Sequence, residues 1–466
     1  MQTWLRISLL LCTFGFFREM RPSEPFVVEY LTGPDRNITS EELNREIYPF
    51  GTYSVLVQLI LVFLVTDILR YKPIIILSAC AGIVLFAILL WTHTVWELII
   101  GQIFYGTFMA SEVAYYTYIY AKVEKSRYQI VSGHTRSAIL CGKFLGGVFA
   151  QVLVSTESLN YRGLHYISFA SQIVSLIIAL ALPPVQQSIY FYKAEDDDNT
   201  AERVNTSNDP TTLALENGNT ELALEKKASS TTETPTTIAK PKFSWRNASR
   251  LLLQHTVSAY SNRTVLKWSI WWSLATCGQL QVISYAQILW KDIDENHESF
   301  YNGGVEATVT LLGAAAAMAA GLMNGVRHKK WHMWILTICS ILMGAFLIIS
   351  AVTNLLWVAY VMYVIFGVFY FFVITIASAI VAQNLSDDSF GLIFGINTLV
   401  ALVLQTILTL VVVTDSLGFG LDPRNQYIVY GFYFVALAIV YALAVVVGQI
   451  VKCFRKSDEI SVKSTQ

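Results

Sequence analysis

The sequence predicts an all-α membrane protein with twelve transmembrane helices, arranged as two six-helix bundles. Of its 466 residues, 54% are hydrophobic and only 14% are charged, whereas about 25% of the residues in a soluble domain carry a charge. Mean hydropathy is +0.50. Apolar runs long enough to cross a bilayer, about 20 residues each, recur along the chain. One long polar segment separates the first six runs from the last six.

The twelve runs are 3–30, 47–69, 73–93, 95–121, 129–155, 161–184, 265–290, 302–326, 331–352, 355–383, 391–414 and 425–452. We interpret the first run as a retained helix and not as a signal peptide, because it has no small-residue cleavage site and charged residues follow it directly. The predicted parts are an N-terminal bundle, a linker, a C-terminal bundle and a cytoplasmic tail, at 1–184, 185–262, 263–453 and 454–466.

The segment 185–262 is polar. It contains the acidic run Glu195–Asp198 and a Ser/Thr-rich stretch at Ser229–Thr237. Such a composition cannot bury enough apolar surface to fold alone. We therefore expect a mostly disordered cytoplasmic linker that connects the two halves, with a regulatory role as the alternative.

The basic residues predict that both termini are cytoplasmic. In that orientation the short inside loops, such as the one with Lys122, Lys125 and Arg127, hold more Lys and Arg than the outside loops. This is the asymmetry that the positive-inside rule requires. Asn37 begins an Asn-Ile-Thr sequon in the first outside loop, where we expect it to be glycosylated.

Motifs of several other functional classes are missing from the sequence. There is no phosphate-binding loop, HExxH or GxSxG, so we expect neither an ATP-driven pump nor an enzyme. The six cysteines are scattered, and we expect no metal or cofactor. A net charge of −1 does not indicate nucleic-acid binding. Two six-helix halves with a cytoplasmic joint are typical of the major facilitators, whose substrate site lies between the halves near the midplane.

Ionisable side chains inside apolar runs are costly in hydrocarbon and mark candidate sites. Glu24 lies between two prolines in the first run; the alternative is that the helix ends there and Glu24 lies in the outer interface. Glu112 in the fourth run shares a helical face with Gln102 and Tyr105. That face offers a cation both charge and aromatic rings, but Glu112 could instead hold the fourth and fifth helices together.

Arg136 and Lys143 lie seven residues apart on one face of the fifth run and are natural partners for Glu112. Structural pairing and substrate contact both remain open for them. Lys143 lies deep in the run and should have a carboxylate partner, with Glu112 as the first candidate. Because Arg21 is poorly placed on the helix face, we expect Glu24 to be the acid most exposed to substrate. Weaker candidates in later runs are Gln281, Ser284, Tyr285, Gln287, Tyr301, Asn302, Glu306, Asn397 and Gln405.

Ordered motifs in both halves resemble the reduced-folate and thiamine carrier family. In the first half they are Pro22-Ser-Glu-Pro-Phe26, Tyr30-Leu-Thr-Gly-Pro-Asp35, Glu46-Ile-Tyr-Pro49, Thr66-Asp67 and Val131-Ser-Gly133. In the second half they are Gln287-Ile-Leu-Trp290, Tyr301-Asn-Gly, Val305-Glu-Ala307 and Phe394-Gly-Ile-Asn-Thr398. The resemblance spans nearly the whole chain except the linker. It implies a vitamin carrier of the major-facilitator type in the plasma membrane.

Within that family, the charge of the substrate separates two branches. Folate carriers have Arg where this chain has Glu112 and Gly367, and Lys where it has Gln405. The thiamine branch resembles this chain at Glu112 and Gln405. Folate is a dianion and thiamine is a cation, and opposite charges in a low-dielectric site discriminate by several kcal/mol. The resemblance therefore favours the thiamine branch.

The resemblance also implies site residues. Positions that match substrate contacts of the thiamine branch are Glu24, Tyr48, Tyr105 and Ser284. The chain differs from that branch at Gly51, Leu85, Gln102 and Lys143, where the branch has Trp, Thr, Glu and Tyr. The predicted substrate-binding set is Glu24, Tyr48, Gln102, Tyr105, Glu112, Lys143 and Ser284. A structural or coupling role is predicted for Asp67, Arg136, Glu306 and Gln405.

Three functions follow as hypotheses. The first is a secondary transporter that carries thiamine or a closely related vitamin across the plasma membrane by alternating access between the two bundles. The second is a carrier of folate or another organic anion, in which Lys143 and Arg136 replace the missing cations. The third is a membrane sensor or scaffold that does not transport. The expected partners are a small vitamin and membrane lipid.

Overall fold

The computed structural model describes residues 3–34, 36, 38–122, 128–185, 245–294, 300–323, 332–385, 390–415 and 418–464. Within these ranges the chain forms helices, turns and loops, and no strand. The helices of the first half are α1 (Thr3–Glu19), η1 (Glu24–Phe26), α2 (Val27–Leu31), α3 (Ser40–Glu42), η2 (Leu43–Ile47), α4 (Tyr48–Ile68), α5 (Lys72–Trp91), α6 (Val95–Ala110), α7 (Glu112–Lys122), α8 (Tyr128–Ser155) and α9 (Tyr161–Ala181). Those of the second half are α11 (Trp245–Ser261), α12 (Arg263–Ile293), α13 (Asn302–Met323), α14 (His332–Val352), α15 (Leu356–Gln383), α16 (Phe390–Val412) and α17 (Pro423–Ser464).

Eight described helices are long and apolar enough to cross a membrane. They are α5, α8, α9, α13, α14, α15, α16 and α17. The helices α1 and α6, with 17 and 16 residues, are shorter than the roughly 20 residues that a span needs. The predicted all-α, multi-pass character is therefore confirmed, and the count of twelve spans stays a prediction.

Two of the predicted runs are interrupted. The first run breaks after Glu19, because proline has no N–H to continue a helix and two prolines follow at Pro22 and Pro25. The chain turns there and resumes as η1 and α2. The fourth run breaks at Ser111, whose hydroxyl donates to the Thr107 carbonyl at 2.6 Å. The break after Glu19 redirects the charged side chains that follow it.

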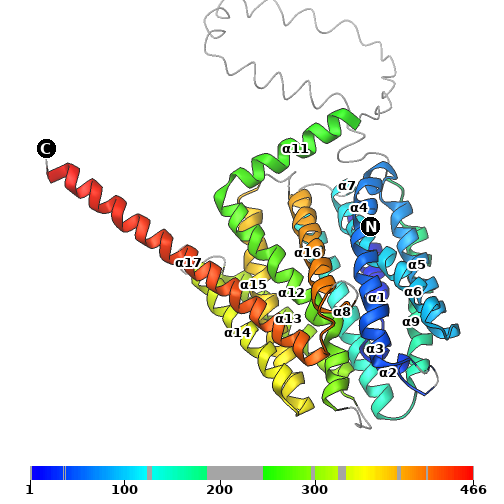
Figure 1. Cartoon of the computed structure of the whole chain (residues 1–466). Coiled ribbons are helices and arrows are strands. Elements are labelled where there is room, and N and C mark those ends of the chain that lie inside the picture. The colour runs from blue at the N-terminus through cyan, green and yellow to red at the C-terminus, as the bar shows by residue number, and fades with distance from the viewer. Residues whose placement is uncertain are drawn as a thin grey trace, which may run out of the picture.

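The two halves of the chain form two groups of helices side by side (Figure 1). Inside the first group α1 packs on α8 and α5 packs on α9, and inside the second α14 packs on α17. The groups meet where α8 crosses α13 and α4 crosses α16. At the α8–α13 crossing, a Cβ atom on Gly147 would lie 2.8 Å from the backbone oxygen of Gly303, and one on Gly303 would lie 2.8 Å from that of Gly147. Only glycine permits this approach.

Polar contacts also join the halves, at the end of the molecule that carries Arg45, Asp415 and Gln426. We call this the joined end. Arg45 pairs with Asp415 at 2.8 Å and donates to the Gly420 carbonyl at 3.0 Å. The Gln426 amide donates to Asn44 at 3.4 Å. These contacts hold η2 against the start of α17 and the segment between α16 and α17.

The C-terminal end of the predicted linker contains α11, which is helical. Ala259 is buried, and the Tyr260 hydroxyl donates to Asn397 of α16 at 2.9 Å, so tertiary contacts stabilise a segment whose composition suggested disorder. Figure 1 shows α11 lying across the top of the second group. The helix α17 likewise continues through the predicted tail to Ser464. The remaining linker (186–244), the sequon residue Asn37 and the side chain of Asp67 lie outside what the structure describes.

Candidate substrate site

The candidate site is built where α1 ends. The last carbonyl groups of a helix have no partner within it, and here two side chains of α9 supply donors. Ser171 donates to the Phe17 carbonyl at 2.7 Å and Gln172 donates to the Arg18 carbonyl at 3.1 Å. The end of α1 is thereby fixed against α9. Arg18 and the residues that follow it project from this fixed turn.

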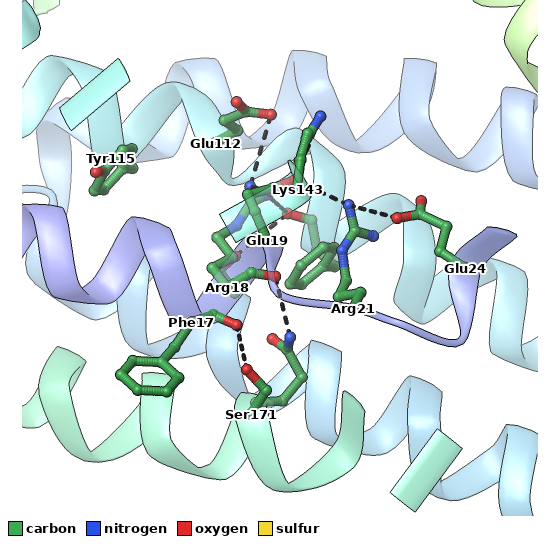
Figure 2. Close-up of polar contacts among 12 residues, drawn as sticks. Phe17, Arg18, Glu19, Arg21, Glu24, Glu112, Tyr115, Lys143 and Ser171 are labelled. Atoms are coloured by element: carbon green, nitrogen blue, oxygen red, sulfur yellow. Dashed lines mark hydrogen bonds and ion pairs between the residues drawn. The ribbon is translucent and has the colours of Figure 1, made fainter. Parts of the chain in front are cut away.

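Six charged side chains gather at the turn: Arg18, Glu19, Arg21, Glu24, Glu112 and Lys143. We call them the charge cluster. Figure 2 shows Glu19 among the three cations. Its carboxylate bonds Arg18, lies 3.0 Å from the Arg21 guanidinium and lies 3.4 Å from the Lys143 ammonium, while its side chain is 3% exposed. A buried carboxylate needs such compensation, because desolvation of an unpaired charge costs several kcal/mol.

Both arginines rest on Phe108. The Arg18 guanidinium lies 4.3 Å from the ring centre and donates to the Phe108 carbonyl at 2.8 Å, and the Arg21 guanidinium lies 5.2 Å from the same ring. An aromatic face stabilises a cation by about 0.5–2 kcal/mol. The residues of α6 therefore support the buried side of the charge cluster.

The pairing differs from what the sequence predicted. Lys143 makes its ion pair with Glu19, not with Glu112. Glu112 instead lies 3.8 Å from Arg18, and Arg21 lies 3.1 Å from Glu24. The expectation that Arg21 is poorly placed assumed a continuous helix. The break after Glu19 turns Arg21 toward Glu24.

Arg136 of α8 is exposed, and none of the ion pairs formed among the described residues includes it. Sequence reasoning missed Arg18 and Glu19 as site residues. Their signal was present, since three charges in four residues directly follow an apolar run. They were interpreted as the flank of a helix, whereas the chain turns and buries them.

The charge cluster has a buried side and an open side. Glu24 and Lys143 keep 49% of their side-chain surface exposed and Glu112 keeps 31%, although all three are paired. Arg18 and Arg21 are buried. Charges on the open side can therefore bind a ligand without first leaving their protein partners.

Polar and aromatic groups of α4 and α6 border the open side. Tyr105 is within electrostatic range of Arg21, Glu24 and Lys143. A Cβ atom on Gly51 would collide with the side-chain oxygen of Gln102 and would lie 3.8 Å from the Tyr105 ring. The absence of a side chain at Gly51 thus makes room for Gln102 beside Tyr105.

The candidate side chains of the second half are mostly engaged in contacts with other protein groups. The rings of Tyr48 and Tyr285 meet edge to face across the halves, with centres 6.2 Å apart. The Ser284 hydroxyl donates to the Leu280 carbonyl of its own helix at 2.8 Å. Glu306 accepts from the Tyr363 hydroxyl at 2.9 Å.

Gln405 is buried, with 4% exposure. The structure therefore brings Glu24, Gln102, Tyr105, Glu112 and Lys143 together and leaves Ser284 engaged elsewhere. Among the described residues no group of three or more His, Cys, Asp or Glu side chains is placed to hold a metal ion.

Gln287 of α12 connects the second half to the turn beside the charge cluster. Its amide nitrogen donates to the Glu24 carbonyl at 2.9 Å and its amide oxygen accepts from the Val28 N–H at 3.3 Å. The backbone that carries Glu24 is thereby tied to α12. Any movement between the halves would shift this carboxylate.

Similar structures share the fold. A bacterial homologue of the human lysosomal transporter Spinster, in an inward-facing conformation, has a TM-score of 0.61 at 11% identity and covers 96% of this chain and 98% of its own. The nucleoside transporter NupG has a TM-score of 0.56 at 14% identity and covers 96% of this chain and 99% of its own. The chain therefore shares the fold of these two solved transporters.

Sequence relatives are closer. Thiamine transporter 1 of Homo sapiens is 38% identical over 473 residues, which cover 98% of this chain and 93% of the relative. Folate transporter 1 of Caenorhabditis elegans is 35% identical over 441 residues, covering 94% and 92%. The human reduced folate transporter is 32% identical over 468 residues, covering 98% and 74%. The family model described as "Reduced folate carrier" matches residues 2–429. The chain therefore belongs to the reduced folate carrier family.

Proposed function

We propose that the protein is a secondary transporter of thiamine or a closely related organic cation in the plasma membrane. The observation that carries this proposal is the open side of the charge cluster, where Glu24 and Glu112 keep accessible carboxylate surface in front of buried arginines. The 38% identity to a human protein named Thiamine transporter 1 agrees with it.

Spare acceptor capacity on Glu112 supports cation binding. Charge-assisted hydrogen bonds between nitrogen and a carboxylate oxygen are about 2.7–2.9 Å long, and the Arg18–Glu112 distance is 3.8 Å. Glu112 can therefore accept a donor from a substrate. The phenol ring of Tyr105 beside Glu24 offers an aromatic face to a cationic ring.

The contacts between the halves support alternating access. The Arg45–Asp415 ion pair and the bond from Arg45 to the Gly420 carbonyl are exposed or half-buried polar contacts, and such contacts can be exchanged for water at a cost of about 1 kcal/mol each. In the orientation that the basic residues predict, the joined end faces outside and both termini face the cytoplasm.

Uptake of labelled thiamine into cells or proteoliposomes tests the proposal. Unlabelled thiamine should compete with the label, folate should not, and preloaded thiamine should accelerate uptake by counterflow. Competition by folate at lower concentration than thiamine would contradict a cation site. Binding without counterflow would instead indicate a sensor or scaffold.

A specific observation favours a second candidate, a carrier of folate or another organic anion. The Lys143 ammonium is half exposed, and Arg136 is exposed on the same helix. An anion would use both cations. In that case Lys143→Met would abolish uptake and Glu24→Gln would leave it nearly unchanged, which is the reverse of the pattern expected for thiamine.

A further inference from the structure

A further carboxylate lies between the two halves and takes no part in the charge cluster. Glu29 belongs to α2, the short helix that follows the Pro25 turn, and is 6% exposed. The Asn302 amide at the start of α13 donates to its Oε1 atom at 3.0 Å. Glu29 thus joins the first half to the second from a buried position.

The hydrogen bonds around Asn302 fix which end of its amide faces Glu29. The Tyr360 hydroxyl of α15 donates to the Asn302 oxygen at 2.7 Å. The amide nitrogen is therefore the atom directed at the carboxyl group. Asn302 is fully buried and Tyr360 nearly so, which leaves this arrangement little freedom to change while the halves stay in contact.

The other carboxyl oxygen of Glu29, Oε2, is buried and has no hydrogen-bond partner in the part of the chain that the structure describes. An ionised carboxylate in that position would have neutral donors only, and none of the described residues donates to Oε2. Leaving a buried charge so poorly compensated is much more costly than leaving a neutral polar group unsatisfied. The geometry therefore favours the carboxylic acid over the carboxylate.

The groups that face Glu29 come from every neighbouring element. They are Tyr48 of α4, Tyr161 of α9, Lys291 of α12, and Asn302 and Tyr360 of α13 and α15. Of these, Lys291 carries a positive charge that acts on Glu29, and its ammonium donates to Thr32. A single cation engaged with a hydroxyl group does not replace the missing donor at Oε2.

We propose that Glu29 is a proton-binding site that links pH to the position of the two halves. While the halves are in contact, Glu29 holds a proton. When they separate and water reaches α2, Glu29 ionises as a carboxylate in water does, with a pKa of about 4.3. Closure then takes up one proton, and because the closed state binds more protons, acid favours it.

This inference rests on the alternating access proposed above. In the predicted orientation the joined end faces outside, so Glu29 exchanges its proton with the outside solution when the joined end opens. The proton is bound and released on the same side, so the site regulates the conformational equilibrium and does not by itself carry protons across the membrane. External acidity should therefore favour the closed state.

Spin labels at two exposed positions of the joined end, Ser158 and Asn354, would measure the separation of the halves in the full chain in nanodiscs. Labels introduced through a ketone-bearing unnatural amino acid leave the native cysteines unmodified. Distance distributions collected between pH 8 and pH 5 should show a closed-to-open ratio that rises by up to about tenfold for each unit of acidification.

Glu29→Gln should remain closed and lose this pH dependence, because a glutamine side chain is always neutral. Glu46→Gln, which removes an exposed carboxyl group of the same region, is the matched control and should titrate as the wild type does. Asn302→Leu removes the donor to Glu29 and should move the midpoint to higher pH, and this second variant keeps the test informative where Glu29→Gln does not fold.

Each outcome has a distinct meaning. Two distance populations whose ratio is independent of pH in the wild type, or a Glu29→Gln variant that titrates normally, would overturn the assignment of Glu29 and leave alternating access intact. One distance that never changes with pH or added thiamine would overturn alternating access itself, and this inference with it.

Discussion

Removing the charge of Glu19 should destabilise the protein more than removing any other charge of the cluster. Glu19 is 3% exposed and interacts with Arg18, Arg21 and Lys143. Breaking a buried ion pair by deleting one partner typically costs about 3–5 kcal/mol, because the remaining charge is left buried without compensation. We expect Glu19→Gln to lie near the lower end of that range, because Arg18 and Arg21 stay buried but keep Glu112 and Glu24 as partners, while Lys143 can turn toward the open side.

A double-mutant cycle separates this explanation from a general packing defect. Lys143→Met removes one of the cations that Glu19 balances, so the double variant Glu19→Gln/Lys143→Met should lose less free energy of unfolding than the two single variants together. Coupling between residues in contact is typically about 0.5–3 kcal/mol. Denaturant titration of the purified protein in mixed micelles measures each free energy.

The control is the same cycle with Glu112→Gln in place of Glu19→Gln. Glu112 pairs with Arg18 and not with Lys143, so the Glu112–Lys143 coupling should be clearly smaller than the Glu19–Lys143 coupling. Larger coupling for Glu112 would refute the pairing described above and restore the pairing that the helix order suggested. Additivity in both cycles would refute any role for Lys143 in balancing the cluster.

Three further predictions concern transport and orientation. Glu24→Gln should lower the efficiency of thiamine uptake by roughly tenfold to a hundredfold at normal surface expression, because a charge-assisted hydrogen bond is worth about 1.5–3 kcal/mol; unchanged uptake would remove the support for a cation site there. Exchanging the joined-end charges as Arg45→Asp/Asp415→Arg should recover most of the uptake that Arg45→Asp alone loses, and equal loss in both would exclude the ion pair as a functional contact. Asn37→Gln should increase electrophoretic mobility by removing a glycan. Protease added to intact cells should leave the 186–244 segment uncut. Cleavage of that segment in intact cells would contradict the predicted orientation.

Much of the fold could be predicted because hydropathy and proline act locally. Apolar runs of sufficient length become helices in any membrane context, and Pro22 and Pro25 interrupt the first run wherever it packs. The ion pairs could not be predicted in this way. The direction that the chain takes after Glu19 depends on Ser171 and Gln172 of α9, more than 150 residues away. Helix order alone therefore assigned Lys143 to the wrong carboxylate.

Site residues were predicted where a charged side chain lies inside an apolar run, and they were missed where the charge lies at the edge of a run. Glu112 and Lys143 stand out because a charge within an apolar run is costly unless it has a partner or faces a cavity. Glu19 does not, since a charge at the edge of a run is common. The helix α11 was missed for a similar reason, because its stability depends on contacts such as Tyr260 with Asn397, which composition does not report.

The contact between Gly147 and Gly303 has a mechanical consequence. Backbone-to-backbone packing of small residues in membranes depends on van der Waals contact and not on interlocked side chains, so α8 and α13 can tilt against each other without disengaging. The contact lies in the interior of α8 and at the start of α13. We expect it to serve as a pivot that persists while Arg45 and Asp415 separate. Gly147 and Gly303 would then define the axis about which the two halves tilt. The Arg45–Asp415 ion pair would only limit how far the joined end opens.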